Sequence, residues 1–141
     1  MNDAYRTALF DVVKDTSAKR GYDLPEPIEA YVVMLLATHV DKSDFLPDAF
    51  GTTLLKLKNS SEAKKLGDTC LFVAGVFPNI GERKGLKRRY YQDIGSTSYE
   101  MVAEVQNPEL FSTLATHFNF LSEFIEVTVN SSKLQNYNLF R

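Results

Sequence analysis

Along most of this chain, hydrophobic residues recur every three or four positions, which is the period of an amphipathic helix. The pattern predicts a first helix over residues 3–20, closed by Gly21. A second helix is expected to open at residues 25–27, because proline is tolerated in a first helical turn. The apolar sides of these two helices consist of Tyr5, Leu9, Val12, Val13, Thr16, Ile28, Tyr31, Val32, Leu35, Leu36 and His39.

Three further helices are expected in the middle of the chain, after the breakers at residues 44–47. A short helix passes through the leucines of residues 54–57. The next helix takes Ser61 as its N-cap and stops at Pro78, because proline cannot continue a helix interior. A third helix is expected over residues 87–105, where apolar residues again follow the helical period.

The C-terminal third predicts one more long helix, which starts after Asn107 with Pro108 at its first position. Residues 125–129 alternate and include β-branched side chains, so both a helix and a short extended tail remain open there. About six helices without a convincing pair of strands predict an all-α fold. We expect a single helical domain over residues 1–141, built as a bundle.

Glycines interrupt the two central helices, and each costs about 1 kcal/mol relative to alanine in a helix interior. Gly67 and Gly75 fall on the first of these helices and Gly95 on the second. Small residues let two helix backbones approach closely, and dispersion across the contact then offsets the lost helix propensity. We therefore expect a tight antiparallel hairpin in which the small residues of the two helices, Gly75 and Gly95 among them, face one another.

The same small residues allow a second interpretation, in which the space between the helices admits a ligand beside Asp68, Tyr91 and Tyr99. An acid within a mostly apolar helix needs a partner, because an unpaired buried charge is costly. A tyrosine hydroxyl or a nearby arginine can supply it. We expect Asp68 to be a structural hydrogen-bond hub, and both interpretations of the glycines remain open.

Two sequence segments in this region, LGDTCLFVAGVFP and RRYYQDIGSTSYEMVAEV, resemble an uncharacterised bacterial protein family. Members of that family show a similar pattern of Leu-Gly-Asp, Leu-Phe, Gly-x-Phe-Pro, Tyr-Tyr, Gly and Tyr. Residues 28–46 are weakly similar to the helix that precedes the pattern, and the specific part is 66–105. The resemblance implies a helical fold, but it implies no activity, cofactor or catalytic residue.

Charge is distributed unevenly along the chain. Five cations and one acid within residues 82–89 give net +4, so the rest of the chain carries −6 within an overall charge of −2. The cations are Arg83, Lys84, Lys87, Arg88 and Arg89. One interpretation of this basic turn is a solvated turn whose cations cap the preceding helix or form surface pairs. The other is a site for a small anion or an acidic partner, flanked by Tyr90 and Tyr91. Nucleic acid is an unlikely partner, because one short basic patch on an acidic protein is a weak signal.

The remaining composition gives few chemical candidates. Of the 141 residues, 44% are hydrophobic and 24% charged, which is typical of a soluble globular protein. The single cysteine, Cys70, lies in an apolar stripe and is expected to be an inert buried thiol. No metal-ligand or nucleophile motif is present, so we expect no catalytic residue, metal or cofactor. The lone cysteine, the absence of a signal-peptide pattern and the short apolar runs predict a cytoplasmic protein without a membrane partner.

These observations favour a cytoplasmic, non-catalytic helical module that binds a partner protein or self-associates. Phe120 lies off the main apolar stripe of its helix, so it belongs either to a second apolar face for another subunit or to a wide buried face. A binding module for a small anionic ligand or an acidic partner at residues 83–89 is the second hypothesis. An unrecognised enzyme is the third.

Overall fold

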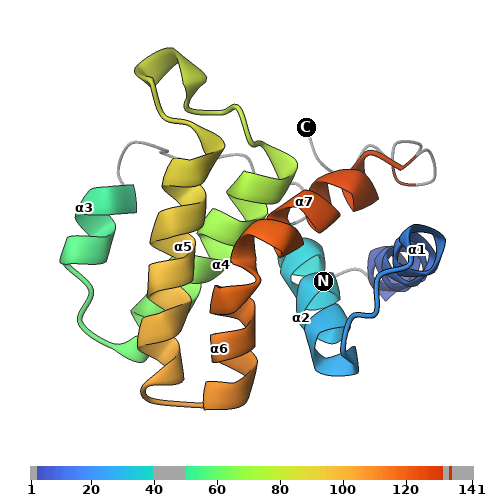
Figure 1. Ribbon diagram of the computed structural model, residues 1–141, viewed down its shortest axis with the longest axis horizontal. Coiled ribbons are helices and arrows are strands. Elements are labelled where there is room, and N and C mark those ends of the chain that lie inside the picture. Colours follow the sequence, from blue (N-terminus) through green and yellow to red (C-terminus); the bar gives the residue numbers. More distant parts are fainter. Residues whose placement is uncertain (1–2, 40–49, 132–133, 135–141) are drawn as a thin grey trace. The chain divides into compact units, whose positions relative to one another are not determined.

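The computed structural model of the chain describes residues 3–39, 50–131 and 134, and the elements in this part are helices (Figure 1). The described residues form seven α-helices and one 3-10 helix and contain no β-strand, so the all-α prediction is confirmed. No helix among them is both long enough and apolar enough to cross a bilayer. The chain divides into two compact units, Met1–Ser43 with Phe124–Arg141, and Asp44–Glu123. The single domain over residues 1–141 stays a prediction.

The first unit contains α1 (Asp3–Arg20), α2 (Glu26–Thr38) and the second half of α7 (Phe118–Val129). As predicted, α1 ends at Gly21, whose φ of 70° lies in the left-handed region that suits glycine. Its core consists of residues that the helical period had marked: Leu9, Val12, Val13, Ile28, Val32, Leu35 and Leu36 are all buried.

Polar groups and one ring pair also hold the first unit together. Lys14 Nζ lies 3.2 Å from Glu29 Oε1 and so joins α1 to α2. The ring of Tyr22 meets Phe124 of α7 edge-on at 5.7 Å between centroids. At the end of α2, His39 Nδ1 lies 2.8 Å from the Leu35 carbonyl oxygen, so this histidine caps the helix.

The second unit contains the two central helices and their neighbours. Its elements are α3 (Phe50–Leu55), α4 (Ser60–Val76), the 3-10 helix η2 (Glu82–Lys84), α5 (Arg88–Ala103), α6 (Pro108–Thr116) and the first half of α7. The contact between α4 and α5 is the most extensive one between elements, and α5 also packs against α6. In Figure 1, α5 lies across α4 and the two helices are joined by the loop that contains η2.

The start of α4 corrects one prediction, because the N-cap is Asn59 and not Ser61. Asn59 Oδ1 accepts a 2.9 Å hydrogen bond from the Glu62 backbone N–H, and Glu62 Oε1 accepts one of 2.9 Å from the Lys58 N–H. This reciprocal pair satisfies two backbone donors at once, as a capping box does. The helix therefore begins earlier than the serine suggested, while it ends before Pro78 as expected.

The C-terminal region corrects a second prediction, because the expected long helix is two helices, α6 and α7, which meet at His117. Figure 1 shows the chain bending between them. His117 has neither a proline nor a glycine beside it, and the apolar period continues through the bend. The sequence therefore contains no local signal for the bend. Residues 125–129 belong to α7, so of the two alternatives for this segment the helix is correct.

Candidate functional site

Asp68 and Tyr99 join α4 to α5. The Tyr99 hydroxyl donates a 2.7 Å hydrogen bond to Asp68 Oδ1, and Lys64 Nζ lies 3.1 Å from Oδ2. Tyr99 is fully buried, and the Asp68 side chain is only 17% exposed. Both carboxylate oxygens thus have partners, which fits the prediction that Asp68 is a structural hub. The tyrosine hydroxyl that we expected is one partner, but the second is a lysine of the same helix and not an arginine.

The glycines lie at the contact between α4 and α5, but they do not face one another. A methyl group on Gly67 would lie 2.6 Å from Cδ1 and Cε1 of the Tyr99 ring. A methyl group on Gly95 would overlap the ring of Phe118 and lie 2.9 Å from Cys70 Cβ. Each glycine therefore makes room for an aromatic ring, and Tyr99 and Phe118 fill the space that the second interpretation assigns to a ligand.

Gly75 does not lie opposite Gly95. Three contacts fix an antiparallel register between α4 and α5. They join Gly67 to Tyr99, Cys70 to Gly95, and the Ala74 carbonyl to Arg88. In that register Gly95 faces Cys70, and Gly75 is a turn further along α4, where it is buried. The predicted antiparallel hairpin with glycines at its contact is therefore present, but the rings of Tyr99 and Phe118, rather than small residues alone, occupy the space beside Gly67 and Gly95.

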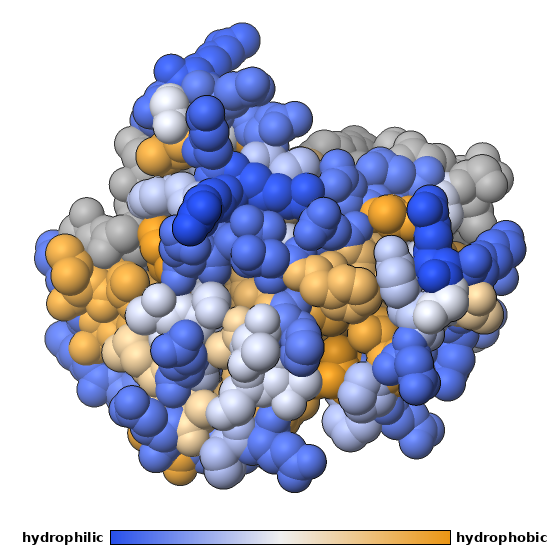
Figure 2. Space-filling view, in the orientation of Figure 1, coloured by the Kyte–Doolittle hydropathy of each residue, from blue (hydrophilic) through white to orange (hydrophobic). Residues whose placement is uncertain are grey.

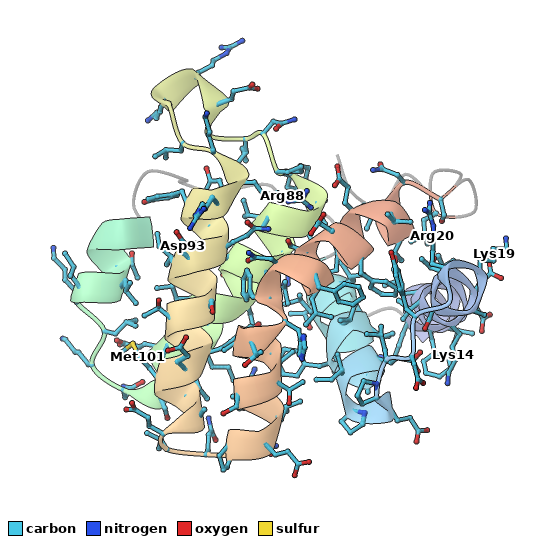
Figure 3. All side chains as sticks on the ribbon, viewed as in Figure 1. Lys14, Lys19, Arg20, Arg88, Asp93 and Met101 are labelled. Atoms are coloured by element: carbon cyan, nitrogen blue, oxygen red, sulfur yellow. The ribbon has the colours of Figure 1, made fainter. Side chains whose placement is uncertain are left out.

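Arg88 belongs to the structural core of the unit and not to an exposed cationic site. Its Nε donates to the Ala74 carbonyl oxygen at 2.9 Å, and one terminal nitrogen donates to the Ser122 carbonyl oxygen at 3.0 Å. Ala74 lies in the last turn of α4, where carbonyls lack helical partners and attract cations. Figure 3 shows Arg88 at this end of α4. Arg88 thus fits the interpretation of a solvated turn in which some cations cap the preceding helix.

A buried hydrogen-bond chain continues from Arg88 into α7. Gln92 Nε2 donates to Ser122 Oγ at 2.8 Å, and Ser122 Oγ donates to the Asn119 carbonyl oxygen at 2.8 Å. Gln92 and Ser122 are both buried, so these bonds satisfy polar atoms that water does not reach. Sequence reasoning missed both residues. Their signal was a polar side chain within an apolar helical stripe, a pattern that surface residues also show.

The other four cations of the basic turn point into solvent. Arg83, Lys84, Lys87 and Arg89 are exposed, and Figure 2 shows hydrophilic residues over the loop that projects at the top of the view. Arg89 Nε lies 3.6 Å from Asp93 Oδ2, and both side chains are more than half exposed, so water screens this pair. These four residues are called the exposed basic turn below.

The backbone of the exposed basic turn is held by its own hydrogen bonds. The Gly81 carbonyl oxygen accepts from the N–H groups of Lys84 and Leu86, each at 3.0 Å. Gly85 has a φ of 76°, a left-handed conformation that glycine adopts without strain. Tyr91 is buried below the turn, and a methyl group on Gly81 would overlap its hydroxyl. Close packing therefore connects the turn to α5.

The structure does not gather the predicted ligand-binding residues into one site. Asp68 and Tyr99 lie together, but Tyr91 is eight residues earlier in α5, which places it about 12 Å away along the helix axis. Tyr91 lies beside the basic turn instead, with its ring edge-on to Tyr90 at 5.2 Å between centroids. Two separate places result, a filled core contact at Asp68 and an exposed cationic surface at residues 83–89.

Cys70 lies at the centre of the α4–α5 contact and is fully buried. Burial disfavours the thiolate and raises the pKa of this thiol well above its ordinary value. Among the described residues, no group of three or more histidine, cysteine or acidic side chains is placed to hold a metal ion.

Comparison of the chain with protein-family models, with curated proteins and with solved structures gives no match. The resemblance of residues 66–105 to an uncharacterised bacterial family therefore stays a prediction.

Proposed function

We propose that this protein is a cytoplasmic, non-catalytic helical module that binds an acidic partner protein through the exposed basic turn. The observation that carries the proposal is that the cations of this turn differ in their contacts. Arg88 donates to two backbone carbonyls in the core, while Arg83 and Lys87 form no ion pair with any described residue. Free cations on a fixed loop are available to a partner's carboxylates.

The fixed backbone supports binding because little conformational freedom is lost when a partner docks. The hydrogen bonds to the Gly81 carbonyl and the packing of Tyr91 beneath the turn order this segment in advance. Preorganised loops bind more tightly than mobile ones for the same contacts, since the entropy of ordering is not lost at the moment of binding. The lysine and arginine side chains still move, but their attachment points are set.

A protein with several carboxylates suits this surface better than a small anion. An exposed ion pair contributes at most about 1 kcal/mol, so a single anion gains little from cations in solvent. A partner that presents several acids along one surface adds several such terms and also gains from long-range attraction. The charge of the surface therefore favours an acidic protein segment over a phosphate or a nucleotide.

A titration with a glutamate-rich peptide, followed by fluorescence anisotropy, tests the proposal. The double variant Arg83→Gln/Lys87→Gln is expected to weaken binding about ten-fold at low salt, because two exposed contacts of up to 1 kcal/mol are lost. The matched control Lys19→Gln/Arg20→Gln removes the same charge from the end of α1 and is expected to leave binding nearly unchanged. Equal weakening by both double variants would show that only net charge matters and would contradict the proposal.

Self-association is a second candidate, supported by apolar side chains that stay exposed on the second unit. Phe120 is 37% exposed, Met101 37% and Val105 70%. Large apolar side chains at a surface are typical of contacts between proteins when they lie close together. Figure 3 labels Met101 on α5, and Val105 lies two residues after the end of that helix.

A further inference from the structure

A groove lies between α3 and the first half of α4, away from the basic turn. Its volume is about 490 Å³, which falls within the usual range for small-molecule sites. Seven residues line it: Thr53, Lys56, Leu57, Glu62, Lys65, Leu66 and Thr69. The helix α3 also contacts α5, so the groove is formed where a short helix rests on the α4–α5 pair.

One face of α4 supplies most of the groove. Residues 62, 65, 66 and 69 recur at the spacing that places side chains on one side of a helix. Leu66 is buried and half-buried Leu57 follows α3, so the two leucines supply the apolar part of the lining. Lys56 and Lys65 are exposed, as expected for long side chains with apolar stems and charged ends at a groove rim.

The charges around the groove favour an anion. Neither Lys56 nor Lys65 forms an ion pair with a described residue. Glu62, the acid of the groove, already accepts the Lys58 backbone N–H through Oε1. Asp68 does not line the groove, and its carboxylate accepts from Tyr99 and Lys64 instead. The lining therefore carries two positive charges, from the exposed Lys56 and Lys65, against the one negative charge of Glu62, and no carboxylate of the described residues pairs with either lysine.

We propose that the groove between α3 and α4 binds a small monocarboxylate with an apolar body, such as a medium-chain fatty acid. The carboxylate lies between the Lys56 and Lys65 ammonium groups, and the apolar body covers Leu57 and Leu66. Charge complementarity selects the head group, and removal of apolar surface from water supplies affinity. This site is independent of the basic turn, so either one can fail without the other.

Binding of decanoate, followed by amide chemical shifts of the whole chain in solution, tests this site. Decanoate is expected to shift the amides of residues 53–57 and 62–69 in a saturable way. Decanol lacks the charge and decyltrimethylammonium reverses it, so both are expected to bind at least about five-fold more weakly. Shifts that map elsewhere, or equal binding of decanol, would overturn the proposal.

Three lysine variants separate the groove from general charge effects. Lys56→Gln and Lys65→Gln are each expected to weaken decanoate binding about three-fold to five-fold, the loss that corresponds to one exposed charge contact. Lys58→Gln removes an adjacent exposed charge that does not line the groove and is expected to leave binding unchanged. All three positions are on the surface, so the fold is retained. If Lys58→Gln weakens binding as much as the other two, or if an acidic peptide shifts these amides and decanoate does not, the proposal is wrong.

Discussion

The hydroxyl of Tyr99 donates a 2.7 Å hydrogen bond to Asp68, and the ring of the same tyrosine covers Gly67, the residue immediately before that aspartate. One side chain of α5 therefore uses both its polar end and its ring against two consecutive residues of α4. The glycine and the acid of the Leu-Gly-Asp segment thus serve one contact.

The first prediction concerns the polar half of this contact. Asp68→Ala is expected to lower the free energy of unfolding by about 1–3 kcal/mol, because the buried Tyr99 hydroxyl loses a charged acceptor. Urea denaturation measures the effect. Asp93→Ala, an exposed acid on α5, is the control and is expected to change stability by less than about 0.5 kcal/mol. If Asp68→Ala unfolds at the same urea concentration as the parent, Asp68 is not a structural hub.

The second prediction concerns the glycines. Gly67→Ala and Gly95→Ala are each expected to destabilise the protein by about 1–3 kcal/mol through overpacking, although alanine is the better helix former. The new methyl group meets the buried ring of Tyr99 in the first case and that of Phe118 in the second. Thr97→Ala, at an exposed position of α5, is the control and is expected to be neutral or slightly stabilising. A gain in stability at Gly67 or Gly95 would show that the rings move aside freely.

The third prediction separates two adjacent arginines. Arg88→Gln is expected to lower the free energy of unfolding by about 2 kcal/mol, because the Ala74 and Ser122 carbonyls lose a charged donor. Arg89→Gln removes the same charge from the surface and is expected to cost less than about 0.5 kcal/mol. Thermal and urea unfolding check the difference. Similar stability of the two variants would remove the structural role given to Arg88.

The fourth prediction concerns pH. Burial raises the pKa of the Cys70 thiol, so the native state keeps this proton while the unfolded chain releases it near its ordinary pKa of about 9.0. The unfolded state then binds fewer protons, and stability falls as pH rises above that value, by up to about 1.4 kcal/mol per pH unit. Urea unfolding between pH 8 and pH 10 checks this. In Cys70→Ala, the free energy of unfolding is expected to fall less steeply with pH than in the parent. Equal slopes in the two proteins would mean that Cys70 contributes nothing to the decline.

The fifth prediction tests self-association through Phe120. Sedimentation equilibrium of Phe120→Glu is expected to show a lower average mass than the parent, with unchanged unfolding, if the exposed part of the ring contacts another copy. Asn119→Glu, at an exposed position of the same helix, adds the same single negative charge and is the matched control. An unchanged mass together with a lower melting temperature would place Phe120 in a wide buried face instead.

Much of the fold could be predicted from the sequence. The helical period predicted α1 to α5 and the stretch that forms α6 and α7, and Gly21, Pro78 and Pro108 marked several helix ends, but the 3-10 helix η2 was not predicted. These signals depend only on neighbouring residues, so they can be recognised without knowledge of the rest of the chain. The bend at His117 was missed, because no local breaker marks it and the apolar period continues across it.

The candidate sites were less predictable. Five cations in one turn are visible in the sequence, but only the structure shows that Arg88 turns inward while its neighbours stay exposed. The groove lined by Lys56 and Lys65 combines two helices, and no single stretch of sequence marks it.

The amino-acid sequence by itself determined which segments are helical and that glycines interrupt the two central helices, because backbone propensity and apolar period act within a few residues. Tertiary packing decided what fills the space beside each glycine, since the rings of Tyr99 and Phe118 come from 32 and 23 residues further along the chain. It also decided that Asp68 is bound by a tyrosine and a lysine. Partners distant in sequence are chosen by shape and by the need to satisfy buried charge, and both arise only when the helices meet.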